Sequence, residues 1–432
     1  MTRLSTPTST GTILGQNAYF AAHSDAGCFI HSINQVYGGI KSTGSPTRVP
    51  CKSLSTLTTE EIAFLAKFCI IVPLQNASKA TIDTFSFLAR EGLVNAINEK
   101  RCKLAIDFSN ESCSLHLYDR INSILESYGV INTSHCAILS QNRQLNELQT
   151  SKAILKPFCF DFFPLATLSY LRKTVSEANI HELVTSRHSV NKPGDILCLN
   201  ATPRLHRIIT LLMLIKVGLI DKEQKPFNTA IRCPFVSFPG FSYSKTGGLT
   251  AEATKQELTK MGLDDRLEDL EWLLSVSPLK VDDLAEEGNQ LATKIILKHY
   301  VDTHLSVVNE TGTDNSARRL TEKSLKPLAL GHPFVIIGHL KSVELARELG
   351  FSTMDHIIDH GYDSQPDPLQ RTAMAVQSAK RFIAMIHSGE IRSSDIMPHS
   401  THNINWAREG LLEHYYIRFV LPIIRFLEFE LP

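Results

Sequence analysis

The chain has 432 residues, more than one hydrophobic core usually holds, and 43% of them are hydrophobic. Lysine plus arginine equals aspartate plus glutamate at 44 each, so no overall charge points to nucleic acid or a membrane as partner. The nine cysteines are scattered and include no Cys-x-x-Cys pair, which argues against a zinc ribbon or a thioredoxin-like site. Most cysteines have apolar neighbours, no apolar run reaches membrane-spanning length without a charge, and the N-terminus lacks the apolar core of a signal peptide. We therefore expect a cytoplasmic protein with no membrane span.

The first half of the chain alternates between strand and helix patterns. Periodicity is weak up to Thr59. Residues 103–108 (KLAIDF) form an apolar run typical of a buried strand, and the segment after them has helical spacing and stops at Gly129. Residues 135–142 (HCAILSQN) contain a second apolar run. Strand, helix and strand at this spacing predict a βαβ unit and a parallel sheet.

A Pro-Gly break at 191–195 (NKPGD) separates this pattern from a second one of the same kind. After it we expect strands at 195–200, 304–310 and 333–338, helices at 205–218, 266–275, 284–302, from Thr321 and at 341–350, and a loop-rich region between 220 and 265. The sequence thus predicts an α/β protein of two domains, 1–190 and 191–404. A helical tail over 405–432 should pack back on the first domain, because its apolar pattern needs a partner surface.

Cations gather where two predicted strands of the second half lead into helices. They are Arg204, Arg207, Arg319 and Lys323. Free N–H groups at helix N-termini favour anions, and Glu310 and Glu322 nearby could accept hydrogen bonds from ribose or sugar hydroxyls. This mixture suits a nucleotide diphosphate. The alternative is that Thr321 is an ordinary N-cap, followed by Glu322 in the first helical turn.

Two carboxylates follow the predicted strand 103–108 in the first half. Asp107 or Glu111 could be a catalytic general base that deprotonates an acceptor hydroxyl. Both could equally cap the helix that follows, and this is the favoured interpretation of Asp107.

The sequence offers little for a metal. No Asp-x-Asp occurs, so the divalent-metal motif of one large class of sugar-transfer enzymes is missing. His356 and His360 have the one-turn spacing of two ligands on a helix, but Gly361 follows at once and the glutamate of the metalloprotease motif is absent. We expect a surface pair or a hydrogen-bonded pair of histidines and no metal site.

The segment after the break resembles the donor-binding domain of fucosyltransferase-type glycosyltransferases of the GT-B fold. In that family a strand ends in Ser-Asn, and an arginine follows in the next helix. Asn200 and Arg207 match this pattern, with Leu199 in place of the serine. A glutamate later follows another strand, and Tyr-Ile-Thr-Glu-Lys opens a helix.

The second motif is matched at Glu310 and at 320–323 (LTEK), with Arg319 in the tyrosine position. The similarity is closer to a bacterial and phage branch of such proteins, whose further motifs appear here as Lys326-Pro327, His332-Pro333-Phe334, Gly350-Phe351 and Tyr362-Asp363. The resemblance covers residues 195–375 in outline.

This resemblance implies two Rossmann-like domains facing each other across a cleft. It implies metal-independent transfer of a sugar from a nucleotide-diphosphate sugar, with no cofactor. Lys323 and Arg207 would neutralise the diphosphate, Glu322 would hold the ribose, and Glu310 would lie near the donor sugar. The donor-binding residues would be Asn200, Arg204, Arg207, Glu310, Arg319, Thr321, Glu322 and Lys323.

Two acceptor classes remain open, a glycan or lipid-linked saccharide and a hydroxymethylated base in phage DNA. DNA requires a basic groove. The candidates for it are Arg90, Lys100, Arg101, Lys103 and Arg120, with acidic residues interspersed. A different class of function, a non-catalytic nucleotide-binding or scaffold protein, is favoured by Arg319 and by the missing serine.

Overall fold

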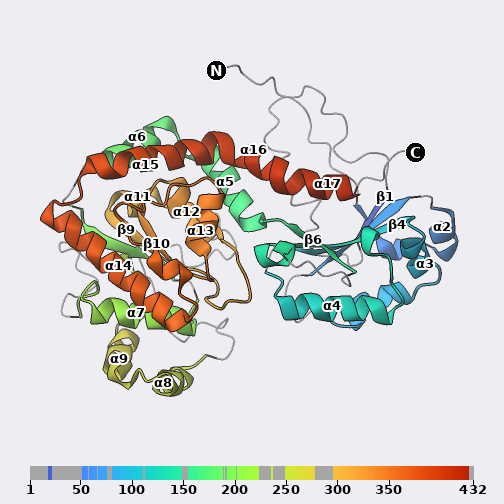
Figure 1. Cartoon of the computed structure of the whole chain (residues 1–432), viewed down its shortest axis with the longest axis horizontal. Coiled ribbons are helices and arrows are strands. Elements are labelled where there is room, and N and C mark those ends of the chain that lie inside the picture. Colours follow the sequence, from blue (N-terminus) through green and yellow to red (C-terminus); the bar gives the residue numbers. More distant parts are fainter. Residues whose placement is uncertain are drawn as a thin grey trace. The chain divides into compact units, whose positions relative to one another are not determined.

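The structure is a computed structural model that describes residues 18–21, 51–56, 58–65, 67–74, 80–109, 112–147, 154–187, 189, 192–200, 202–222, 235–236, 249–277 and 295–427. The chain forms two compact units (Figure 1). Unit 1 comprises Met1–Ala166 and Glu413–Pro432, and unit 2 comprises Thr167–Leu412.

Unit 1 is built on a parallel sheet with the strand order β2-β1-β3-β4-β5-β6. Its strands are β1 (Ala18–Ala21), β2 (Cys51–Ser53), β3 (Phe68–Pro73), β4 (Cys102–Phe108), β5 (Cys136–Ser140) and β6 (Lys156–Cys159). Its helices include η1 (Leu54–Thr56), α2 (Thr59–Phe64), η3 (Asp83–Ala89), α3 (Leu93–Asn98), α4 (Leu115–Ser127), η4 (Thr133–His135) and η5 (Arg143–Glu147), and α5 (Phe162–Thr174) crosses into unit 2. The predicted βαβ unit is confirmed as β4, α4 and β5.

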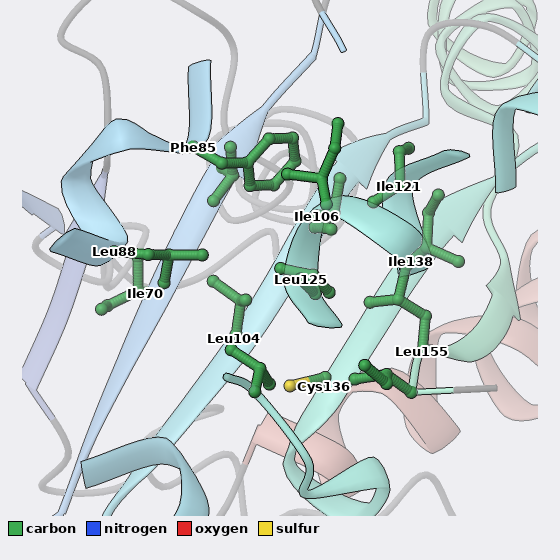
Figure 2. Close-up of a cluster of buried hydrophobic side chains, with 14 of the residues drawn as sticks. Ile70, Phe85, Leu88, Leu104, Ile106, Ile121, Leu125, Cys136, Ile138 and Leu155 are labelled. Carbon is green, nitrogen blue, oxygen red and sulfur yellow. The ribbon is translucent and has the colours of Figure 1, made fainter. Parts of the chain in front are cut away.

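The core of unit 1 lies between this sheet and the helices that cover it (Figure 2). Alternate residues of the central strands, such as Leu104, Ile106 and Ile138, meet α4 through Ile121 and Leu125. β4 and β5 are buried along their whole length, as expected of strands that are covered on both faces.

Unit 2 has a second parallel sheet, with the order β10-β9-β7-β8. Its strands are β7 (Gly194–Cys198), β8 (Phe235–Val236), β9 (Thr303–Asn309) and β10 (Phe334–Ile337). Its helices are α6 (Glu177–Ser186), α7 (Leu205–Lys216), α8 (Ala251–Lys260), η6 (Asp264–Arg266), α9 (Leu267–Ser275), α11 (Leu297–Val301), α12 (Glu322–Ala329), α13 (Ser342–Glu348), η7 (Gly361–Ser364), α14 (Pro368–Ser388) and α15 (Ser393–Asn405). The chain then continues through η8 (Trp406–Gly410), α16 (Leu411–Tyr415), η9 (Tyr416–Val420) and α17 (Leu421–Leu427).

Local sequence signals account for several of these boundaries. Ser114 caps α4 by accepting a hydrogen bond from the N–H of Leu117 at 3.2 Å, and Gly129 follows the helix with φ +82°. Thr321 caps α12 in the same way, accepting from the N–H of Lys323 at 3.3 Å. Two elements depart from expectation. α8 lies in the region predicted to be loop-rich, and α11 is only a short part of the helix predicted over 284–302, of which 284–294 lies outside the described residues.

The division between the units lies at 166/167, whereas the sequence predicted 190/191. The physical reason is that α6 packs against α11 and α15 of unit 2, so the chain enters the second unit before the Pro-Gly break. The segment that belongs to unit 1 starts at Glu413 and not at 405, because Trp406 still donates to the carbonyl of Leu349 in unit 2. Beyond it, the carbonyl of Leu427 accepts from the thiol of Cys69 in β3.

None of the helices in the described ranges has the length and apolar character needed to cross a membrane.

Candidate functional site

The carboxyl ends of β7, β9 and β10 lie at one edge of the unit 2 sheet, because the strands are parallel and adjacent. All eight predicted donor-binding residues lie on the two segments that follow β7 and β9. Direct contacts join these segments. His206 donates to the carbonyl of Glu310 at 3.0 Å, and Arg204 donates to the carbonyl of Thr311.

Glu310 is fully buried, with 0% of its surface exposed, and its carboxylate is occupied by protein donors. One oxygen accepts from the N–H of Thr321 at 3.0 Å and from the hydroxyl of Ser324. The other accepts from the hydroxyl of Thr321 at 2.7 Å and from the N–H of Thr311 at 3.2 Å. Burial alone would raise the pKa of Glu310, but Lys323 and these donors outweigh it and hold the pKa below its usual range. In this structure Glu310 fastens the start of α12 to the end of β9.

Arg207 is a buried cation, only 2% exposed, that forms no ion pair among the described residues. Its guanidinium donates to the carbonyls of Thr202 at 3.0 Å and Glu310 at 3.4 Å, while Nε is buried without a hydrogen-bond partner. Burial, with Arg204 acting in the same direction, lowers its pKa to about 10, so the side chain stays charged at neutral pH. A buried charge of this kind favours an anionic ligand, because two carbonyls and the charges of Glu310 and Glu322, which form no direct ion pair with it, compensate it only in part.

Arg204 occupies the N-cap position of α7, and no side chain caps this helix. Its own side chain is exposed. The N-terminus of α7 therefore combines uncapped N–H groups with the charges of Arg204 and Arg207, in the first strand-to-helix turn of the unit. Phosphate groups bind to such turns in doubly wound α/β folds.

At the start of α12, Lys323 is half-buried and its Nζ donates to the carboxylate of Glu322. Glu322 is itself buried. The N–H of Lys323 is already held by the Thr321 hydroxyl, and Thr321 in turn is held by Glu310. Lys323 is thus partly exposed but paired with Glu322, and part of the N-terminus of α12 is capped inside the protein.

The remaining predicted donor residues, Asn200 and Arg319, are both buried. The side-chain amide of Asn200 accepts from Asn309 at 3.1 Å, which ties the turn after β7 to the end of β9. The charge of Arg319 reaches His339, the second residue after β10, and adds to the effect of burial in lowering the pKa of that ring.

Two histidines at this edge were not predicted. His206, on the first turn of α7, has its pKa lowered to about 4 by burial, against the opposing effect of the Glu310 carbonyl. His339 is 3% exposed, donates through Nδ1 to the carbonyl of Asp314 at 2.8 Å, and has Nε2 buried without a partner. Both shifts favour the neutral ring. No local motif marks them, because they enter the site through contacts between segments far apart in the sequence.

The predicted general bases lie in unit 1. Asp107, near the end of β4, is buried and accepts from the N–H of Ser109 at 3.1 Å and from the Ser109 hydroxyl. It does not cap the following helix, as had been favoured, since Ser114 does so. Glu111 lies outside the described residues. A catalytic role for either residue stays a prediction.

The two histidines with metal-ligand spacing are both hydrogen-bonded to the protein. Nε2 of His360 lies 2.8 Å from the carbonyl of Thr353, and Nε2 of His356 lies 3.1 Å from the carbonyl of Asp395. In the described part of the chain, no three side chains of metal-binding type come together.

No family model matches the chain, and no curated protein matches it. Solved structures with a similar layout include trehalose-6-phosphate from E. coli bound with UDP-2-fluoro glucose, with 10% identity, a TM-score of 0.41, and coverage of 86% of this chain and 76% of that one. Others are the α,α-trehalose 6-phosphate synthase of Burkholderia multivorans (10% identity, TM-score 0.40, covering 85% and 72%) and the UDP-forming α,α-trehalose-phosphate synthase of Burkholderia vietnamiensis (11%, 0.41, 85% and 74%). At such values the likeness is loose, so what this chain binds has to be inferred from its own residues.

Proposed function

We propose that the protein is a GT-B-type glycosyltransferase that takes a sugar from a nucleotide-diphosphate sugar bound at the carboxyl edge of the unit 2 sheet. The observation that carries the proposal is the buried charge of Arg207, which has no carboxylate partner among the described residues and lies beside the uncapped start of α7. Arg204 on the same turn and Lys323 on α12 supply two further cations that are more accessible.

Cations in these positions have a chemical use in sugar transfer. When the bond between the sugar and the diphosphate breaks, negative charge grows on the leaving diphosphate. Preorganised positive groups stabilise that charge as it develops. Arg204, Arg207 and Lys323 would act in this way without a metal, which agrees with the missing Asp-x-Asp.

We favour a glycan over DNA as the acceptor class. Of the five cations considered for a DNA groove, three are engaged within unit 1. Lys103 is buried and donates to the carbonyl of Phe426, Arg90 donates to the carbonyl of Leu54 at 2.8 Å, and Arg101 pairs with Glu99 at 3.0 Å. These residues do not supply the continuous basic groove that phosphate backbones need.

Calorimetric titration with UDP, GDP, CDP, ADP, dTDP and pyrophosphate tests the proposal. We expect the protein to bind pyrophosphate and at least one nucleotide. Arg204→Ala and Lys323→Ala should each weaken both by about tenfold, because each removes a charge-assisted contact. Arg381→Ala is a matched control, since its exposed guanidinium on α14 pairs with Asp359 in the same unit.

The outcomes separate the alternatives. If none of the six ligands binds, the edge is not a diphosphate site and the proposal is wrong. If a nucleotide binds but no sugar nucleotide with the same base is transferred or hydrolysed, a non-catalytic nucleotide-binding protein is the better description. Turnover that disappears in Lys323→Ala supports the enzyme.

A further inference from the structure

A sugar nucleotide has many hydroxyl groups, and its site needs acceptors for them as well as cations for phosphate. Glu310, which the family resemblance places near the sugar, has both oxygens occupied by four protein donors. Glu322 already accepts from Lys323. Since Glu310 is saturated and one oxygen of Glu322 is engaged, a site for several hydroxyls needs further acceptors on the same edge.

The loop after β9 presents such acceptors beside a glycine. A Cβ built on Gly312 would lie 2.9 Å from Cε1 and 3.3 Å from Nε2 of His339, and 3.2 Å from Oδ2 of Asp314. The backbone of Gly312 has no positive φ, so its conformation does not require glycine. Space does, because the edge of the His339 ring, with Cε1 nearest, and Oδ2 of Asp314 occupy the face where any other residue would carry its side chain.

Nε2 of His339 and Oδ2 of Asp314 can both accept a hydrogen bond. Nδ1 of His339 donates to the carbonyl of Asp314, and a carbonyl only accepts, so in the neutral ring Nε2 carries the lone pair. This Nε2 is buried and has no protein partner. The other atom belongs to Asp314, whose Oδ1 accepts from the N–H of Ser316 at 2.8 Å and from the Ser316 hydroxyl, while Oδ2 faces Gly312. The carboxylate is ionised, because the Ser316 bonds outweigh burial and lower its pKa.

The loop is held in place from the elements around it. Arg371, on α14, is almost fully buried and donates to the carbonyl of Thr313 and to the side chain of Asn315 at 3.3 Å. Arg204 holds the carbonyl of Thr311 from the start of α7. A loop fixed in this way keeps its acceptors positioned before a ligand arrives, which lowers the entropy cost of binding.

We infer that Gly312, Asp314 and His339 form a subsite for adjacent hydroxyl groups of the sugar nucleotide, one hydroxyl donating to Oδ2 of Asp314 and the other to Nε2 of His339. The inference rests on the proposed function, since the cations of Arg204 and Lys323 would hold the diphosphate of the same ligand. Two acceptors without a donor select hydroxyls and disfavour a further phosphate.

The test compares pyrophosphate, which has no sugar hydroxyls, with UDP-, GDP-, CDP-, ADP- and dTDP-glucose, in titrations of the full chain. Asp314→Asn keeps an oxygen for the Ser316 bonds and replaces Oδ2 with a donor. His339→Asn keeps a donor where Nδ1 was and removes Nε2. Each should weaken the best-bound glucose nucleotide by about tenfold, or about 1.4 kcal/mol, and leave pyrophosphate affinity within twofold. Asp265→Asn, an exposed aspartate of the same unit, is the charge-matched control.

Thermal unfolding of each variant checks that the fold is intact, and Asp314→Asn carries the test if His339→Asn unfolds. Unchanged affinity of Asp314→Asn for the glucose nucleotide overturns the subsite and leaves the proposed function standing. Equal loss of pyrophosphate affinity also overturns it, because the residues would then act on phosphate. A wild type that binds neither pyrophosphate nor a glucose nucleotide overturns both proposals together.

Discussion

Glu310 illustrates how a single buried side chain can organise the edge of a sheet. Its carboxylate gathers donors from the loop after β9 and from the first turn of α12, and its carbonyl accepts from His206 and Arg207 on α7. Glu310 therefore forms hydrogen bonds with both helices that carry the proposed phosphate contacts, α7 and α12. Removing its charge should therefore mainly lower the stability of the protein, and should affect ligand binding only as a consequence.

We expect Glu310→Gln to lower the free energy of unfolding of unit 2 by roughly 2–4 kcal/mol, because the amide N–H₂ would face the backbone N–H of Thr311 or of Thr321, neither of which can turn away. Both tryptophans, Trp272 and Trp406, lie in unit 2, so their fluorescence in a urea titration reports this unit alone. Glu344→Gln is the control and should change stability by less than about 0.5 kcal/mol, since that carboxylate is partly exposed on α13.

The difference in stability between wild type and Glu310→Gln should depend on pH. The pKa of Glu310 is lowered in the folded protein, so its contribution is complete above the unfolded pKa of about 4.3 and is lost as the pH falls through the folded value. The difference between wild type and Glu310→Gln should narrow below about pH 4. A difference that stays constant with pH, or is absent at pH 7, would contradict the assigned role of the charge.

At the scale of elements, the sequence predicts what local patterns determine. Apolar runs, helical spacing and the glycines that follow the two helices, Gly129 and Gly218, locate β4, α4, β5, β7 and α7 to within a few residues. The sequence does not predict α8, because the apolar stripe of this helix is narrow, with Thr254 and Leu258 as its buried residues. The sequence does not predict His206 and His339 as site residues, because their roles depend on contacts between the segments around α7, β9 and β10, which no single stretch of sequence encodes.

The opposite edge of the unit 2 sheet holds a buried amine. Lys192, just before β7, donates to the carbonyl of Thr303 at the start of β9 at 2.8 Å. Burial lowers its pKa to about 6, Arg187 adds to the effect, and Asp302 opposes it. The amine is therefore mostly neutral at pH 7 in the folded protein, whereas it is charged in the unfolded chain.

We expect Lys192→Met to stabilise unit 2 at pH 7, on the order of 1–3 kcal/mol. The Thr303 carbonyl keeps a partner, because Nε2 of His332 lies 3.0 Å from it. Between about pH 6 and pH 10.4 the unfolded wild type binds one proton more at this residue, so its stability rises with pH across that window. In urea titrations the advantage of the variant should shrink as the pH increases. Lys298→Met, at an exposed lysine of α11, should show no such trend, and a Lys192→Met variant less stable than wild type would refute the interpretation.

On the scale of the whole molecule, the two units have separate cores and separate sheets, and every residue assigned to phosphate or hydroxyl binding belongs to unit 2. A ligand that binds only the native form of one unit stabilises that unit by mass action, by about 2.7 kcal/mol at one hundred times its dissociation constant. Ligand binding should therefore stabilise unit 2 and leave the stability of unit 1 unchanged.

We expect hydrogen exchange with pyrophosphate present to slow in α7 and α12 of unit 2, and to stay unchanged in β4 and β5 of unit 1. Amides of α7 that exchange by opening of unit 2 should slow by about a hundredfold at that ligand concentration, because opening must then release the ligand. Arg204→Ala at the same pyrophosphate concentration should exchange about tenfold faster than the liganded wild type, because a tenfold weaker site is then at only about ten times its dissociation constant. Slowing in β4 with none in α7 would place the anion in unit 1 and would contradict the assignment of the cations after β7 and β9.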